Sequence, residues 1–214
     1  IKGIKSCVPL AEAAQQILVY ARDAESGRVD AWLVDARTQG VHIESREKLM
    51  GLRALPLHRM LFDNVTVDLD ARLGGAAGID FDAILSRQQV ALAALAVGVA
   101  RGAFEYARDY AKQRVQFGKP IAQNQAIAFM LAESAIEVDA ARLMVWEAAW
   151  KLDRGEDAAR AAYLAKQYAD KAVLQVTDSA VQTLGGYGFI REYPAERWLR
   201  NGRGFPAFHG LAIV

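Results

Sequence analysis

The sequence predicts an α+β chain in which an antiparallel β subdomain, residues 1–78, precedes an up-down four-helix bundle, residues 79–214. Two observations lead to this prediction. Short apolar runs separated by turn residues fill the first third of the chain, a pattern that is typical of strands and hairpins. After about residue 81, apolar residues recur at helical spacing over three long segments that contain few helix breakers.

The β subdomain is predicted from four short runs. Residues 17–21 (ILVYA) and 29–34 (VDAWLV) flank a Glu-Ser-Gly turn, which predicts a hairpin. Residues 41–45 (VHIES) and 60–67 (MLFDNVTV) alternate in polarity and are rich in β-branched and aromatic side chains. Short strands of this kind favour an antiparallel sheet or a small barrel. The glycine-rich residues 73–78 mark the end of this part.

The helical part is predicted to hold three long helices, over residues 84–113, 124–154 and 157–184. Gly155 suits the left-handed position that follows a helix. Pro194 suits the first turn of a shorter last helix, residues 195–201. Because the connections are short, neighbouring helices are expected to run antiparallel, and a four-helix bundle is the natural arrangement.

Composition excludes several classes of function. The chain has 53% hydrophobic and 24% charged residues and a formal net charge of +1, which describes a globular protein with a core and no broad attraction to nucleic acid or anionic lipid. Any anion site must therefore be local. The longest apolar run, residues 90–100, is shorter than the ~20 residues of a membrane-spanning helix. We therefore expect no nucleic-acid partner and no membrane span.

Cysteine and histidine usage points the same way. Cys7 is the single cysteine of the chain, so no disulfide can form within it, and a reducing compartment, the cytoplasm, is the simpler expectation. The three histidines are widely spaced, and no cysteine and histidine cluster has the spacing of metal ligands. We expect no metal site.

The segment between the first two long helices reads QRVQFGKPIAQNQ, residues 113–125. Arg114 can donate two parallel hydrogen bonds to a phosphate. Phe117 offers a ring for stacking, and Gly118 allows close approach of a ligand to the backbone. Gln125 can bond polar edges of a ligand. The composition alone equally fits a plain interhelical turn with a solvated arginine and a buried phenylalanine.

The order of these residues, R-x-x-F-G-x-x-I-x-x-x-Q, resembles the helix–helix junction of acyl-CoA dehydrogenases. Residues 182–189 (QTLGGYGF) resemble the Q-x-x-G-G-x-G-[FY] loop of that family, and residues 193–201 (YPAERWLRN) resemble its Y-P-x-E-R-x-x-R-D segment. The resemblance covers the C-terminal part of the family's β domain and its C-terminal helical bundle domain. The family's N-terminal helical domain lies outside it, so that either the sequence is a portion of the gene product or a partner completes the site.

The resemblance implies FAD as the cofactor. Arg114, with Phe117 and Gln125, would contact the pyrophosphate and adenosine portion of the dinucleotide. Three further residues, Gln182, Gly185 and Gly186, would approach the same dinucleotide from a neighbouring subunit, which implies a homodimer or homotetramer. The two glycines also fit a simple helix end and turn.

The reaction implied by the resemblance is α,β-desaturation of an acyl-CoA thioester, with hydride transfer to FAD and an electron-transferring flavoprotein as acceptor. The family's base is a glutamate, commonly in a Y-E-G-T segment. Here Phe208, His209, Gly210 and Leu211 fall at that place, so that His209 occupies the base position. Phe208 and Gly210, with Arg87 on the first long helix, are then expected beside the substrate.

Some family members place the glutamate before the arginine that matches Arg87, and Ser86 occupies that position here. Three explanations stay open. His209 acts as the base; the chain is a non-catalytic subunit of a hetero-oligomer whose partner supplies the glutamate; or the chain is a degenerate or truncated copy. A flavin oxygenase or oxidase on the same fold is a further alternative.

Overall fold

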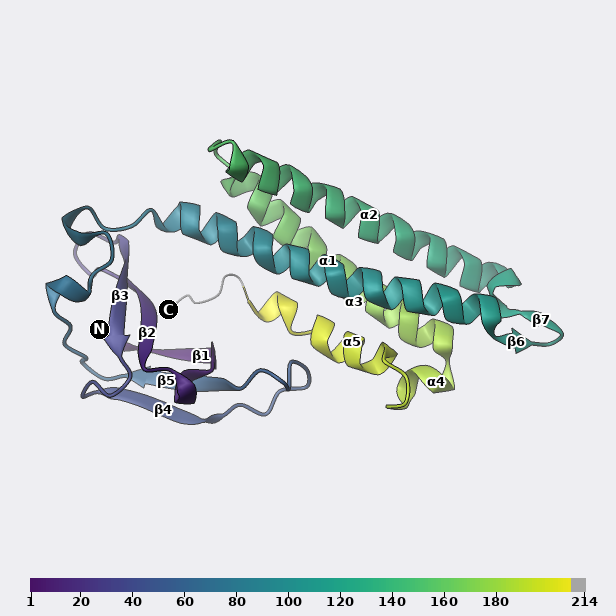
Figure 1. The fold of residues 1–214 in the computed structure, drawn as a ribbon, viewed down its shortest axis with the longest axis horizontal. Helices are drawn as coiled ribbons and strands as arrows, with labels where there is room; N and C mark the ends of the chain where they lie inside the picture. The colour runs from purple at the N-terminus through teal and green to yellow at the C-terminus, as the bar shows by residue number, and fades with distance from the viewer. Residues whose placement is uncertain (209–214) are drawn as a thin grey trace. The chain divides into compact units, whose positions relative to one another are not determined.

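The computed structural model describes residues 1–208, which form two compact units, residues 1–84 and residues 85–208 (Figure 1). The units divide six residues beyond the boundary expected between residues 78 and 79, inside the first long helix. Each unit has its own hydrophobic core.

The first unit is an antiparallel β structure, as predicted. Its five strands are β1 (Gly3–Pro9), β2 (Gln16–Arg22), β3 (Val29–Asp35), β4 (Val41–Arg46) and β5 (Leu57–Phe62). One sheet has the order β1-β5-β4, and β2 pairs with β3 in the expected hairpin. Three short 3-10 helices complete the unit: η1 (Ala11–Ala13), η2 (Leu69–Ala71) and η3 (Gly75–Ala77).

The core of this unit is built from alternate strand residues that point inward, since successive strand side chains face opposite sides. Val19, Val34, Met60 and Phe62 are among its buried members. The strand expected over residues 60–67 is wrong at its C-terminal end. β5 stops at Phe62 because Asn64 has a left-handed backbone (φ 51°), which breaks the extended conformation.

The second unit is helical, as predicted. Its long helices are α1 (Phe81–Gln113, which begins in the first unit), α2 (Gln125–Asp153) and α3 (Ala159–Leu184), followed by α4 (Gly186–Phe189) and α5 (Ala195–Gly202). Each expected helix is present, and every end lies within three residues of its predicted position. Smaller elements are β6 (Val115–Gln116), β7 (Lys119–Pro120), η4 (Ile121–Gln123) and η5 (Phe205–Ala207).

Alanine dominates the core of the bundle. α1 buries Ala93, Ala96 and Ala100 completely, and they pack in one cluster with alanines and valines of α2 and α3. Small side chains let the helix backbones approach closely, so that close contacts fill the core without large side chains. Within residues 1–208, α1 alone has the length and hydropathy of a membrane span. A bundle core helix satisfies the same criteria, and this helix contributes its alanine face to the core.

A buried ion pair ties the C-terminal segment to α3. The ammonium of Lys166, which is fully buried, donates to Asp170 Oδ2 at 2.6 Å and to the Phe205 carbonyl at 3.1 Å. Phe205 itself packs in the core of the bundle. The two contacts therefore hold η5 against α3.

Candidate functional site

The first wall of the candidate site is the end of α1 and the hairpin that follows it. The Arg114 amide donates to the Tyr110 carbonyl at 2.8 Å, and the Arg114 carbonyl accepts from the Ile121 amide at 2.8 Å. The backbone of Arg114 is thereby held from both sides. β6 and β7 pair directly after it, and Phe117 and Gly118 form the tip with φ of 51° and 79°. The Phe-Gly turn thus takes left-handed angles that glycine accepts readily.

Phe117 is 98% exposed at this tip. A plain interhelical turn that buries its phenylalanine, the alternative from composition, is therefore wrong for this segment. An aromatic ring in solvent on a stiff hairpin is available for contact with a ligand or another chain.

The second wall is the end of α3. Gly185 has φ 59° and ψ −131°, a conformation open essentially to glycine alone. Its amide donates to the carbonyls of Val181 and Gln182, so it closes the helix. No described atom lies within 4 Å of the position that a Cβ would take at Gly185 or Gly186. A ligand can therefore approach the backbone closely at both residues.

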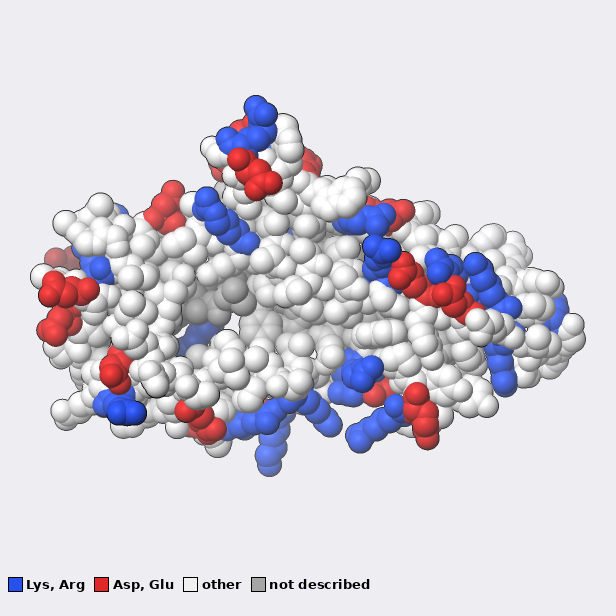
Figure 2. Space-filling view, in the orientation of Figure 1, with Lys and Arg blue, Asp and Glu red and all other residues white. Residues whose placement is uncertain are grey.

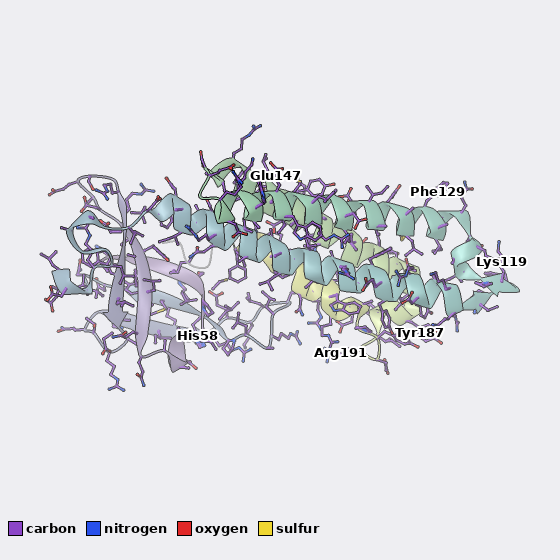
Figure 3. All side chains as sticks on the ribbon, turned by 45° about the horizontal axis from the view of Figure 1, so that its top comes forward. His58, Lys119, Phe129, Glu147, Tyr187 and Arg191 are labelled. Carbon is purple, nitrogen blue, oxygen red and sulfur yellow. The ribbon has the colours of Figure 1, made fainter. Side chains whose placement is uncertain are left out.

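An open pocket of about 500 Å³ lies between these two walls. Its lining joins residues that are about 70 positions apart in the sequence, all within the helical unit of one chain. The lining residues are Tyr110, Arg114, Gln116, Phe117, Ile121, Asn124, Ile127, Gln182, Thr183, Leu184, Gly185, Gly186, Tyr187 and Ile190. Figure 3 labels Tyr187, together with Lys119 on the hairpin, at this end of the bundle.

The pocket is cationic and aromatic. The guanidinium of Arg114 lies 5.2 Å from the centroid of the Tyr187 ring, and no carboxylate of residues 1–208 forms an ion pair with it. Burial raises the pKa of Tyr110, so its hydroxyl stays protonated and able to donate. An arginine without an acidic partner, two tyrosines and several side-chain amides suit a ligand that combines phosphate with a ring.

The structure brings five of the six predicted cofactor residues into this pocket: Arg114, Phe117, Gln182, Gly185 and Gly186. Gln125 does not line it. α2 begins at Gln125, and the preceding Asn124 takes the lining position instead. Within one chain the two motifs lie beside the same pocket. That they reach the cofactor from different subunits stays a prediction.

Sequence reasoning missed two aromatic members of the pocket, Tyr110 and Tyr187. The signal for Tyr110 is its spacing, because a residue four positions before Arg114 lies on the same side of the helix end. Tyr187 follows the glycine pair directly, and its ring packs 5.1 Å from that of Tyr193. That contact joins the loop to the Y-P segment, which spacing alone does not predict.

The predicted substrate residues lie elsewhere. Arg87 is exposed on α1, and Phe208 follows η5; neither lines the pocket. His209 and Gly210 lie outside the described residues.

The β unit holds one unusual cysteine. Cys7 has φ 59° at an irregularity in the β1–β5 ladder, and its thiol donates to Glu47 Oε2 at 3.2 Å. Burial, reinforced by this carboxylate, raises the pKa of Cys7. The thiol is therefore a poor nucleophile at neutral pH.

Comparison with known proteins assigns both units. Residues 81–212 match the C-terminal domain model of acyl-CoA dehydrogenases, and residues 1–65 match the middle domain model. The chain belongs to the acyl-CoA dehydrogenase family. This is a family of flavoprotein oxidoreductases, and the resemblance stated from the motifs is confirmed.

Individual relatives agree. The chain is 38% identical to an acyl-CoA dehydrogenase of Bacillus subtilis, over 98% of this chain and 57% of the relative. It is 36% identical to subunit CarC of the caffeyl-CoA reductase-Etf complex of Acetobacterium woodii, over 100% of this chain and 58% of the relative. The chain thus spans a little over half the length of these relatives.

Solved structures share the fold. Butyryl-CoA dehydrogenase from Megasphaera elsdenii superposes with a TM-score of 0.87 at 33% identity, over 98% of this chain and 56% of that one. The FAD complex of PigA superposes with a TM-score of 0.89 at 28% identity, over 98% and 56% of the two chains.

Proposed function

We propose that the protein is a flavin-dependent acyl-CoA dehydrogenase that desaturates an acyl-CoA thioester between its α and β carbons. The observation that carries the proposal is the pocket in which Arg114 and the Gln182–Gly186 loop meet. Membership of the acyl-CoA dehydrogenase family supports it, as does the FAD complex of a neighbour with the same fold.

The residues of the pocket fit the nucleotide part of FAD. Arg114 would pair with the pyrophosphate, a doubly charged group for which its fork of donors is suited. Gly185 and Gly186 leave open space along the backbone, where a Cβ would limit the approach of a phosphate. Phe117 and Tyr187 offer faces for the adenine ring. When bound, the flavin accepts the β-hydrogen of the substrate as hydride.

The chain must also supply a base for the α-proton. His209 occupies the place of the family's glutamate. The neutral imidazole of a histidine can accept a proton. Hydrogen bonds to the thioester carbonyl would lower the free energy of the enolate as it forms.

A second function competes with this one. No glutamate stands at either base position known in the family, since Ser86 and His209 occupy them. This favours a non-catalytic subunit that binds flavin and supports a partner. One relative, CarC, is itself described as the subunit of a complex.

Anaerobic titration of the full-length, flavin-loaded protein with a panel of acyl-CoAs separates the two functions. If His209 is the base, the visible flavin band of the parent is expected to disappear when acyl-CoA is added. The band of His209→Ala is expected to persist. A band that persists with every acyl-CoA, in a protein that retains its flavin, rejects the dehydrogenase in favour of the supporting subunit. Oxygen consumption by the reduced protein would instead indicate the related oxidase or oxygenase.

The proposal includes partners. The substrate is an acyl-CoA, an electron-transferring flavoprotein accepts the electrons, and the protein is a homodimer or homotetramer in the cytoplasm. Signs of charge are mixed along the helical unit (Figure 2), which suits recognition of local anions better than broad attraction to polyanions.

A further inference from the structure

Among residues 1–208, four arginines lie over an aromatic ring, and the contact of Arg114 with Tyr187 differs from the others. Three of the contacts join residues that are four positions apart, which are Phe104–Arg108, Arg142–Trp146 and Trp150–Arg154. In each of these three, the arginine also pairs with a carboxylate. Arg114 instead lies over the ring of a residue about 70 positions later, at 5.2 Å from the ring centroid.

The contact of Arg114 is therefore tertiary, and it leaves the charge of the arginine without an opposite charge. A contact between residues four apart follows from the geometry of a helix, whereas this one depends on how the ends of α1 and α3 meet. No carboxylate of residues 1–208 pairs with Arg114. The ring attracts the guanidinium without neutralising it, so that the full positive charge remains for a bound anion.

The ring of Tyr187 is itself held by two other tyrosines. It packs 5.1 Å from the ring of Tyr193, which packs edge to face at 6.3 Å from the ring of Tyr110. The Tyr110 carbonyl accepts the hydrogen bond of the Arg114 amide, so the contacts return to the arginine. We name these three residues the tyrosine frame. Two of them, Tyr110 and Tyr193, also pack against a buried cluster of alanines and a leucine, which fixes the frame to the bundle.

The position of Tyr187 is set by the glycine that follows it. Tyr187 belongs to α4, at the hairpin end of the bundle (Figure 3). Gly188 is buried, and a Cβ there would lie 2.4 Å from the Val181 carbonyl oxygen. α4 thus lies directly on the backbone of α3. Tyr187 stands at the open x position of the Q-x-x-G-G-x-G-[FY] motif, so the motif does not predict an aromatic ring there.

A guanidinium that is already held binds a phosphate more tightly than a free one. A flexible arginine loses rotamer freedom when it pairs with a ligand, and that loss weakens binding. Arg114 has lost part of this freedom before a ligand arrives, because the ring of Tyr187 restrains it. Its N–H groups remain able to donate to phosphate oxygens. Phe117, 98% exposed at the hairpin tip, is left as the face on which adenine can stack.

We propose that Tyr187 is a positioning residue for Arg114, whose guanidinium it holds ready for the pyrophosphate of the dinucleotide. The inference rests on the proposed function, in which this pocket holds the pyrophosphate and adenosine portion of FAD. It adds that Tyr187 acts through Arg114 and not by contact with the ligand.

The first test measures the FAD dissociation constant of the full-length apoprotein with Tyr187→Leu, Tyr187→Phe and the control Tyr163→Leu. Tyr163 is an exposed tyrosine of α3 outside the pocket. Tyr187→Leu is expected to weaken binding about three- to tenfold, with unchanged thermal stability. Tyr187→Phe keeps the ring and should match the parent, as should Tyr163→Leu. Parent-like affinity in Tyr187→Leu overturns the inference, and so does an equal loss in Tyr187→Phe, which would assign the effect to the hydroxyl.

The second test repeats Tyr187→Leu in the Arg114→Ala background, with FAD and with ADP, which has the pyrophosphate and adenosine but no flavin. If Tyr187 acts through Arg114, its loss should change both dissociation constants by less than about twofold there, because non-additive effects mark residues that act together. The same loss in both backgrounds means that Tyr187 contacts the ligand itself, which overturns the inference and leaves the pocket its function. Parent-like binding of FAD and ADP by Arg114→Ala overturns the proposed function of the pocket as well.

Discussion

Lys166 illustrates how much a single buried charge determines in this bundle. Its ammonium has two acceptors, Asp170 Oδ2 and the Phe205 carbonyl. An ammonium in a core of alanine and valine is tolerated only with such partners, because desolvation of the charge otherwise dominates. Lys166 thereby bonds a carboxylate of its own helix and also holds the segment after α5 against α3.

Lys166→Met should destabilise the protein by about 3–5 kcal/mol, because it leaves the carboxylate of Asp170 in the core without its ammonium. The double variant Lys166→Met/Asp170→Leu should recover most of this loss, since an apolar pair needs no charge partner. Urea denaturation followed by circular dichroism measures both. Equal free energies of unfolding for the single and double variants would contradict the role of the pair.

Gly185 and Gly186 are neighbours in the pocket that differ in backbone conformation, so they can be compared by the same substitution. Gly185→Ala should lower stability by about 1–3 kcal/mol, since only glycine readily adopts its backbone angles, although no atom blocks the added methyl group. Gly186→Ala should change stability little, because Gly186 begins α4 with φ outside the positive range. Thermal unfolding decides between them; similar losses for both would show that the conformation of Gly185 is not the cause.

At the scale of elements, helices were predictable and small connections were not. The positions of α1, α2 and α3 were predicted from three long segments with helical spacing of apolar residues. The prediction held because the same spacing recurs over many helical turns. The β6–β7 hairpin was not predicted, because its strands of two residues are too short to show alternating polarity in the sequence. α2 begins at Gln125, one residue after its expected start, because a pattern of apolar residues does not fix the first residue of a helix. The contact of Gln125 with FAD stays a prediction.

Within the candidate site, the sequence motifs identified the charged and glycine members but not their arrangement. Tyr187 and Tyr110 enter the pocket through the angle between α3 and the loop that follows it, which depends on tertiary packing. The exposure of Phe117 likewise depends on the hairpin that presents it. These features could be found only once the end of α1 and the end of α3 were seen together.

α5 gives a pH-dependent prediction for one element. Arg200 donates to both carboxylate oxygens of Glu196, at 2.6 and 3.0 Å, and these bonds hold the pKa of Glu196 below its ordinary value of 4.5. A lowered pKa in the folded state stabilises the protein above the ordinary value, and the contribution disappears as the pH falls through the folded pKa.

Glu196→Gln should therefore cost about 0.5 kcal/mol at pH 7, a small fall in Tm, and progressively less as the pH falls below the ordinary value of 4.5. Thermal scans between pH 3 and pH 7 measure the difference. Glu105→Gln, which breaks the more exposed Arg101–Glu105 pair on α1, serves as the control and should show a smaller effect. A gap between Glu196→Gln and the parent that stays constant across this range would contradict the linkage.

At the scale of the whole molecule, an acyl-CoA dehydrogenase fold brings together a β unit and a helical unit, each with its own core. The chain spans little more than half of the length of its relatives. Both walls of the pocket between the ends of α1 and α3 belong to the helical unit. We propose that this pocket holds the flavin dinucleotide.

The most direct measurement of that claim is the flavin content and FAD dissociation constant of Arg114→Ala beside Arg108→Ala. Arg108 is the control, an arginine of the same helix that pairs with Asp109 outside the pocket. Loss of charge-assisted hydrogen bonds worth about 1.5–3 kcal/mol predicts FAD binding roughly 10- to 100-fold weaker in Arg114→Ala, with unchanged thermal stability of the apoprotein. Arg108→Ala should match the parent. Parent-like FAD affinity in Arg114→Ala would contradict the account.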